Sequence, residues 1–331
     1  MLRIAAIVST MVVFAVERAN PDILLFVMTL VSIDLLRRSF AARMLGQSII
    51  FLMGLIKYYP FIVSFLIIKE RFRVLIFFSV IYLFGLFLFV YLYLDQILEN
   101  IFNLPGGSPF VDMIGAQNLP LGLLATLATP TEPVADTVAH MIALMIAVLV
   151  VIVWMMAKLW QTSDVFGMLR RLDEPRRLAL FAGALLLSGC FFAGQSIGYR
   201  GIFLLLILPG LYALGRDKTA GPVGHAAWLA AIGIPPLMWA EPIRLWIHLA
   251  ITGDYPPPGF RSLLVLDQPL DFLVWLVREV AWWLLVALLI TLLVAYLADR
   301  VSSWLGLPER SPKQTPQSIG GATTASARAR T

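Results

Sequence analysis

The sequence predicts an all-α, polytopic integral membrane protein with about eight spanning helices and a re-entrant hairpin around Lys57. Hydrophobic residues make up 60% of the chain and charged residues 14%, whereas soluble domains carry about 25% charged residues. Several apolar runs can cross a hydrocarbon core of about 30 Å. The net charge of +5 does not indicate nucleic-acid binding, because the basic residues cluster in short loops. The single cysteine, Cys190, is predicted to be a packing residue.

The orientation follows from an interval that contains no Lys or Arg, residues 74–157. The interval comprises an apolar helix (74–94), a loop (95–137) and a second apolar helix (138–157). Basic clusters flank it on both sides, which predicts cytoplasmic flanks and an external loop. The loop combines Pro and Gly clusters with apolar side chains, so we expect it to form a folded external cap.

The other predicted spans complete an alternating path with both termini in the cytoplasm. They are residues 2–16, 23–36, 178–194, 202–214, 226–250 and 272–298. Segments 23–36 and 202–214 are short for a spanning helix, so their ends are expected to lie below the membrane surface in a water-filled cavity. Residues 1–307 form one membrane domain, and the polar tail 308–331 is predicted to be disordered.

Lys57 is the only formal charge in the apolar run 45–68, and Tyr58, Tyr59 and Pro60 follow it. A lysine at the centre of a membrane costs about 2.5–3.5 kcal/mol, so it must face protein, water or an anionic partner. Pro60 predicts a helix break just after the lysine. Both ends of the run carry basic clusters, so it either crosses once or turns back as a hairpin, which the proline favours. A phosphate site and a structural ion pair are the alternatives for Lys57.

Two polar groups at the external face are further candidates. Residues 17–22 (ERANPD) link the first two spans, and they equally suit a plain loop with Asn-Pro turn chemistry. Tyr199 and Arg200 lie where two short apolar segments meet, on a face where the orientation bias requires no arginine. A guanidinium binds phosphate bidentately. A salt bridge from Arg200 to Glu17 or Asp22 is the structural alternative.

Charged residues also occur inside two later apolar segments. Glu241, Arg244 and His248 are spaced three and four apart, on one helical face. We expect an ion pair within the helix that offsets the cost of burial, and the same role for Arg278 and Glu279. The histidines lack ligand spacing, so no zinc site is predicted.

Three segments resemble motifs of the GT-C superfamily of membrane glycosyltransferases. The resemblance is closest to glycosyltransferase family 87, which comprises polyprenol-phosphate-mannose-dependent mannosyltransferases and their relatives. Residues 13–36 (VFAVERANPDILLFVMTLVSIDLL) resemble its Glu/Asp-Arg-Gly-Asn-x-Asp loop and the helix that follows. Residues 54–61 (GLIKYYPF) are similar to its Lys-x-Tyr-Pro motif, and residues 199–211 (YRGIFLLLILPGL) to its Tyr-Arg stretch. Together the matches touch three regions within residues 13–211.

The resemblance implies a membrane enzyme of the cell envelope. Such an enzyme transfers a mannose-like sugar from a polyprenyl-phosphate donor to a glycan or glycolipid acceptor on the outer face, without a cofactor. Lys57 and Arg200 would bind the donor phosphate, and a carboxylate would act as general base on the acceptor hydroxyl. The expected substrate-binding residues are Arg18, Asn20, Lys57, Tyr58, Tyr199 and Arg200; Glu17 and Asp22 are the catalytic candidates.

Two departures from the family pattern affect these expectations. The family has glycine where this chain has Ala19, and a methyl group disfavours a positive φ. The family's catalytic aspartate lies in a first external loop, and this chain begins too late to contain that region. We therefore expect either an N-terminally truncated enzyme or a catalytically inactive relative that binds lipid-linked sugars. A small-solute or lipid transporter is a third alternative, although no internal repeat is evident.

Overall fold

The computed structural model describes the chain outside residues 103–107, 111, 128–133, 218, 254–268 and 306–331. The predicted disordered tail 308–331 lies outside the described residues. The first part of the chain forms α1 (Leu2–Ile7), α2 (Thr10–Glu17), α3 (Pro21–Leu35), α4 (Phe40–Ile56), the 3-10 helix η1 (Tyr59–Lys69) and α5 (Phe72–Phe102). The remainder forms β1 (Met113–Ile114), α6 (Asn118–Leu127), α7 (Val134–Thr162), α8 (Val165–Arg171), α9 (Glu174–Ala193), β2 (Ser196–Ile197), η2 (Gly198–Phe203), α10 (Leu204–Arg216), α11 (Gly221–Met238), α12 (Ala240–Thr252) and α14 (Pro269–Trp304).

The described helices support an all-α membrane protein but do not confirm the eight predicted spans. Five are long and apolar enough to cross a bilayer, and α11 with α12, bent by 59°, would form a sixth. The two remaining predicted spans, residues 2–16 and 23–36, form helices that are too short to cross the hydrocarbon core. The first is divided into α1 and α2 at Ser9. The second, α3, has 15 residues and is about 22 Å long, against a hydrocarbon core of about 30 Å.

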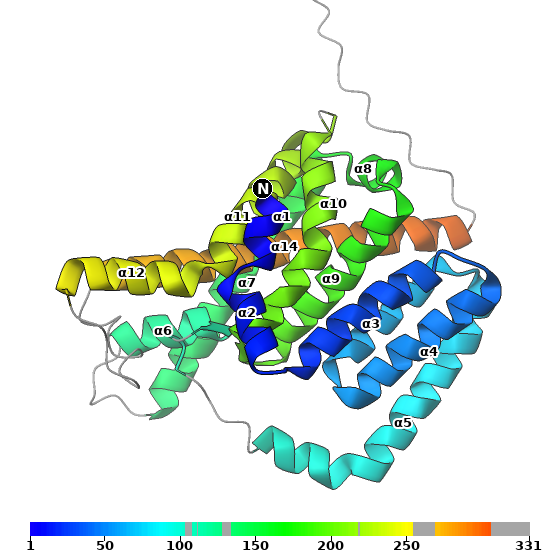
Figure 1. Ribbon diagram of the computed structural model, residues 1–331, viewed down its shortest axis with the longest axis horizontal. Coiled ribbons are helices and arrows are strands. Elements are labelled where there is room, and N and C mark those ends of the chain that lie inside the picture. Colours follow the sequence, from blue (N-terminus) through cyan, green and yellow to red (C-terminus); the bar gives the residue numbers. More distant parts are fainter. Residues whose placement is uncertain (103–107, 111, 128–133, 218, 254–268, 306–331) are drawn as a thin grey trace, which may run out of the picture.

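Helices α9, α10 and α14 form the centre of the bundle (Figure 1). The rings of Phe181 on α9 and Tyr296 on α14 stack at 4.1 Å. Gly183 lets α9 approach α10, since an added Cβ would lie 2.6 Å from Ile207. Cys190 is buried in this core, as predicted. By contrast, α5 and α7 leave most of their apolar surface uncovered, as lipid-facing helices do.

The helices α4 and η1 fold back on each other. Lys57 leaves helical geometry, with φ −141° and ψ 137°, and ends α4. Arg43 in the first turn of α4 then lies 2.9 Å from Glu70, the residue that follows η1. Gly54 permits the close return, because a Cβ there would lie 2.4 Å from the Phe61 ring. The segment is therefore a helical hairpin with Lys57 at its tip.

The predicted external loop 95–137 is largely folded. Helix α5 continues past the predicted end at residue 94 to Phe102, with a kink at Tyr93, and α6 lies farther along the loop. Strand β1 pairs antiparallel with β2, with Met113 opposite Ile197. The strand pair fixes the cap segment against the turn that carries Arg200.

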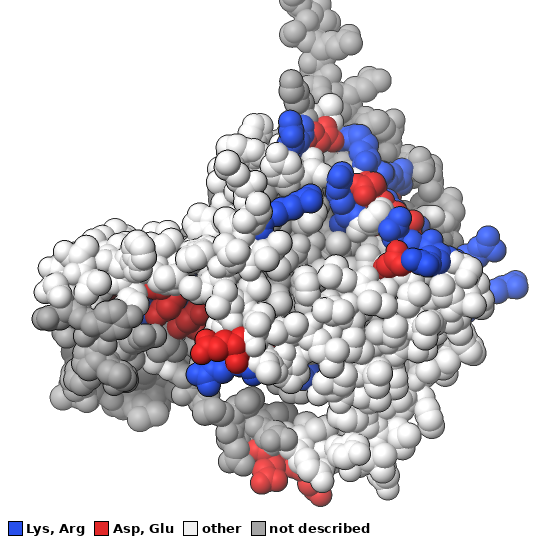
Figure 2. Space-filling model, viewed as in Figure 1, with Lys and Arg blue, Asp and Glu red and all other residues white. Residues whose placement is uncertain are grey.

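Basic side chains gather at one end of the molecule, at the upper right of Figure 2. Ion pairs between distant parts of the chain connect the helix ends there. They are Arg43–Glu70, Lys69–Glu174, Arg170–Asp299 and Arg171–Asp217. These contacts show that the predicted cytoplasmic clusters meet at one end of the bundle.

Candidate functional site

A second charged cluster forms at the opposite ends of the helices that carry these basic groups. It combines the first turn of α3, the tip of the α4–η1 hairpin and η2. Each element contributes one charged residue, Asp22, Lys57 and Arg200 respectively. The three segments in which the sequence predicts a donor site are therefore adjacent in space.

Asp22 is at the centre of this cluster and is fully buried. Its Oδ1 accepts hydrogen bonds from Lys57 Nζ at 2.7 Å and from the Tyr59 hydroxyl at 2.5 Å. Its Oδ2 lies 3.7 Å from Arg200 Nε. Because Asp22 has no exposed surface, an acceptor hydroxyl cannot reach it. In this position Asp22 is the counter-ion of Lys57 and Arg200, and its burial does not favour the expected role as general base.

The local sequence explains how Asp22 is positioned. Asn20 caps α3, accepting the Asp22 backbone N–H at 2.9 Å, and Pro21 occupies the first helical turn, where its missing donor costs nothing. Asp22 lies where the helix dipole favours a carboxylate. The turn before the cap requires φ +44° at Ala19, in the region that glycine adopts more readily.

The two cations remain accessible while their counter-ion is buried. The side chains of Lys57 and Arg200 are 24% and 19% exposed. Arg200 donates from Nη1 to Ser196 Oγ at 2.5 Å, and its guanidinium lies 4.8 Å from the centre of the Tyr59 ring. The Tyr199 ring lies 5.9 Å from Lys57 Nζ. With Asp22 ionised, two cations and one anion give the cluster a net charge of +1.

Other predicted site residues are placed differently. Asn20 lies 3.4 Å from Lys57 Nζ through its side-chain oxygen, so it joins the cluster as well as capping α3. Glu17, Arg18 and Tyr58 are exposed, and Arg18 lies over the Phe14 ring. The Tyr58 ring is exposed beyond the helix break, and its role in substrate binding stays a prediction. The Lys-x-Tyr-Pro motif itself indicates Tyr59, the tyrosine directly before the proline.

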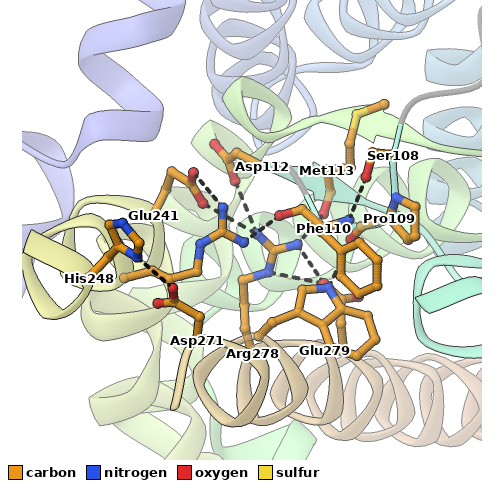
Figure 3. Close-up of polar contacts among 12 residues, drawn as sticks. Ser108, Pro109, Phe110, Asp112, Met113, Glu241, His248, Asp271, Arg278 and Glu279 are labelled. Carbon is orange, nitrogen blue, oxygen red and sulfur yellow. Dashed lines mark hydrogen bonds and ion pairs between the residues drawn. The ribbon is translucent and has the colours of Figure 1, made fainter. Parts of the chain in front are cut away.

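A further buried charge cluster lies between α12, α14 and the start of the cap (Figure 3). The predicted ion pairs are confirmed: Arg244 lies 3.1 Å from Glu241, and Arg278 lies 2.6 Å from Glu279. The sequence did not predict that Asp112 would join them, with Oδ1 3.9 Å from Arg278 Nη1. It gave no signal for this contact, because Asp112 is an isolated aspartate in the loop.

His248 and Asp271 complete this cluster. Nδ1 of His248 lies 2.9 Å from Oδ2 of Asp271, and both residues are buried. In the described part of the chain, no group of three His, Cys, Asp or Glu side chains is arranged to hold a metal ion.

Asp112 differs from the other carboxylates of this cluster. Its side chain is 27% exposed, and it precedes β1 outside the spanning helices. Burial raises the pKa of the Asp112 carboxyl to about 6; Glu241 also raises this pKa, and Arg278 and Arg244 lower it. The group therefore changes its charge around pH 6, below neutral.

Comparisons with known proteins supply no assignment for either cluster: no family model, no curated protein and no solved structure matches the chain.

Proposed function

We propose that the protein is a membrane glycosyltransferase that moves a mannose-like sugar from a polyprenyl-phosphate donor to a glycan or glycolipid acceptor. The observation that supports this proposal is the convergence of Lys57 and Arg200 on one buried carboxylate at the tip of a broken helix. A lipid-linked sugar phosphodiester carries one negative charge, which matches the net charge of the cluster. A guanidinium and an ammonium group are the side chains that bind phosphate best.

The same cluster suits the product of the transfer. Loss of the sugar converts a phosphodiester with one negative charge into a monoester that carries about −1.5 to −2 at neutral pH. Two cations favour this increase in charge, so they stabilise the leaving group more strongly than the bound donor. An interaction that strengthens along the reaction lowers its barrier.

We infer that the cluster opens toward the outer face of the cell membrane and that both termini are cytoplasmic. The basic ends of the helices indicate the cytoplasmic side. Helix α4 has 17 residues, so the tip at Lys57 lies about 25 Å from its basic end. The α4–η1 hairpin is then a re-entrant element, whose non-helical tip packs in part against protein because Lys57 pairs with the buried Asp22.

A second candidate is a membrane protein that binds lipid-linked sugars without transferring them. The burial of Asp22 favours it, because this one of the two carboxylates expected to serve as base cannot be reached. Both candidates require the same donor site, and transfer activity distinguishes them.

Binding of farnesyl phosphate to the purified full-length protein tests the donor site. Lys57→Met and Arg200→Gln should each weaken binding by about 10-fold or more, since a hydrogen bond to a charged group contributes about 1.5–3 kcal/mol. Lys158→Met and Arg216→Gln, at the basic end of the molecule, are matched controls and should leave the affinity unchanged. Farnesol and inorganic phosphate separate the contributions of lipid and anion. Unchanged affinity in both folded site variants would refute the proposal.

A further inference from the structure

Transfer to a hydroxyl requires a carboxylate that the acceptor can reach. Asp22 is excluded by its complete burial. In the neighbouring cluster, Glu279 and Asp271 are buried and paired with Arg278 and His248. Glu241 is 20% exposed, but it lies on α12 and pairs with Arg244. Among the carboxylates of this cluster, Asp112 combines exposure with a location outside the spanning helices.

The backbone places Asp112 against the turn that carries the donor-site arginine. The carbonyl of Asp112 accepts the N–H of Gly198 at 2.9 Å, extending the β1–β2 pairing. The carboxylate also rests on Gly198, because a Cβ added there would lie 2.1 Å from Asp112 Oδ2. Gly198 precedes Arg200 by two residues, so their Cα atoms lie within about 7 Å of each other. The carboxylate and the guanidinium therefore flank the same short turn.

The surroundings of Asp112 suit a group that exchanges a proton. Arg278 Nη1 lies 3.9 Å from one carboxylate oxygen, farther than a hydrogen bond allows. Figure 3 shows Asp112, Glu241 and Arg278 directed toward one another. The negative charge of Glu241 and the positive charge of Arg278 therefore act on the Asp112 carboxylate in opposite directions. A pKa of about 6 keeps Asp112 ionised at neutral pH while leaving it basic enough to accept a proton.

We propose that Asp112 is the general base of the transfer, taking the proton of the acceptor hydroxyl. This inference rests on the proposed function. The acceptor oxygen forms a bond to the anomeric carbon as the bond from that carbon to the donor phosphate breaks. The electron pair of the broken bond leaves with the polyprenyl phosphate, whose added negative charge Lys57 and Arg200 stabilise. The acceptor proton goes to the Asp112 carboxylate and then to solvent.

Transfer from farnesyl-phosphate mannose to octyl α-mannoside, followed with the full-length protein, tests the role of Asp112. Asp112→Asn should lower the transfer rate by at least about 100-fold, the usual contribution of a general base, and change the affinity for farnesyl phosphate by less than about 3-fold. Asp34→Asn, an exposed aspartate at the basic end, is the matched control and should transfer normally.

The pH dependence separates a base from a residue that only supports the fold. In the wild-type protein the transfer rate should rise with pH through about 6, as Asp112 loses its proton, and then level off. Asp112→Asn should lose this rise in its residual activity. Gly198→Ala, which displaces the carboxylate without removing it, should lower transfer while retaining farnesyl phosphate binding.

The outcomes distinguish a failure of the role of Asp112 from a failure of the transferase function. If Asp112→Asn transfers at more than one third of the wild-type rate, or keeps the same pH profile, Asp112 is not the base although the transferase function stands. If the wild-type protein binds farnesyl phosphate but transfers no sugar, the transferase function and the role of Asp112 both fail, and the non-catalytic binder remains.

Discussion

The buried carboxylate of Asp22 should stabilise the fold far more than an exposed aspartate on the same helix does. Asp22→Asn keeps the shape of the side chain and an oxygen for the Tyr59 hydroxyl, but it removes the charge that compensates Lys57 and Arg200. Breaking a buried ion pair costs about 3–5 kcal/mol. The cations are 24% and 19% exposed and can rehydrate in part, so we expect a loss of about 3 kcal/mol.

Asp34→Asn on α3 is the matched control. Asp34 pairs with Arg38 at 2.5 Å, but its side chain is 50% exposed, so its removal should cost about 0–1 kcal/mol. Unfolding by sodium dodecyl sulfate in mixed micelles, followed by near-ultraviolet circular dichroism of the tryptophans, measures both free energies of unfolding. A loss for Asp22→Asn within 1 kcal/mol of the control would refute the reasoning, because an exposed ion pair contributes only about 0–1 kcal/mol.

A double-mutant cycle assigns the loss to the ion pair. If Lys57 and Asp22 stabilise each other directly, Lys57→Met should be less harmful when Asp22→Asn is already present. Residues in contact show coupling energies of about 0.5–3 kcal/mol, and the 2.7 Å separation of Nζ and Oδ1 favours the upper half of that range. Additive losses would show that the two residues act independently.

Two further stability effects should appear in the same unfolding assay. Ala19→Gly relieves the backbone at φ +44° and should stabilise the protein by about 0.5–1 kcal/mol; Ala15→Gly inside α2 should destabilise instead, and equal effects would contradict this account. Asp112→Asn should stabilise the protein at pH 7.5 and by much less at pH 4.5. Because the pKa of Asp112 is raised to about 6, ionisation penalises the folded state increasingly as the pH rises from the ordinary pKa of an aspartate through 6. At about 1.4 kcal/mol per pKa unit, the variant gains at most about 3 kcal/mol in free energy of unfolding. The same gain at both pH values would contradict this linkage.

The sequence predicted which helix ends lie together better than it predicted the lengths of the helices. Basic clusters such as Arg170 and Arg171 identify helix ends directly, and the structure brings those ends together. The break at Ser9 carries no such signal, because no proline or glycine lies in the first sixteen residues. Ser9 is itself completely buried, so its conformation depends on tertiary packing, which a local pattern does not reveal.

The sequence predicted the charged residues of the candidate site, but not the contacts between elements that bring the cap to it. Lys57 and Arg200 stand out because charge is costly in an apolar chain, and Asp22 was an expected partner of the arginine. The pairing of β1 with β2 was not predictable, since Met113 and Ile197 are far apart in the chain and two-residue strands leave no periodic pattern. The contribution of Asp112 depends entirely on that pairing.

Asp22 does not prevent Lys57 and Arg200 from binding an anion. An ammonium group has three donors. Lys57 Nζ contacts Asp22 Oδ1 at 2.7 Å and Asn20 Oδ1 at 3.4 Å, which leaves a third proton beyond these contacts. A guanidinium has five N–H donors, and Arg200 gives one to Ser196 while its Nε faces Asp22.

The proposed function therefore does not require the phosphate to displace Asp22. The counter-ion lowers the cost of burying two cations and holds both in place before the ligand arrives. Such preorganisation reduces the entropy that binding must overcome. On this argument Asp22→Asn should weaken farnesyl phosphate binding even though it raises the net positive charge of the site. Tighter binding by that variant would show that simple charge attraction, rather than fixed geometry, determines the affinity.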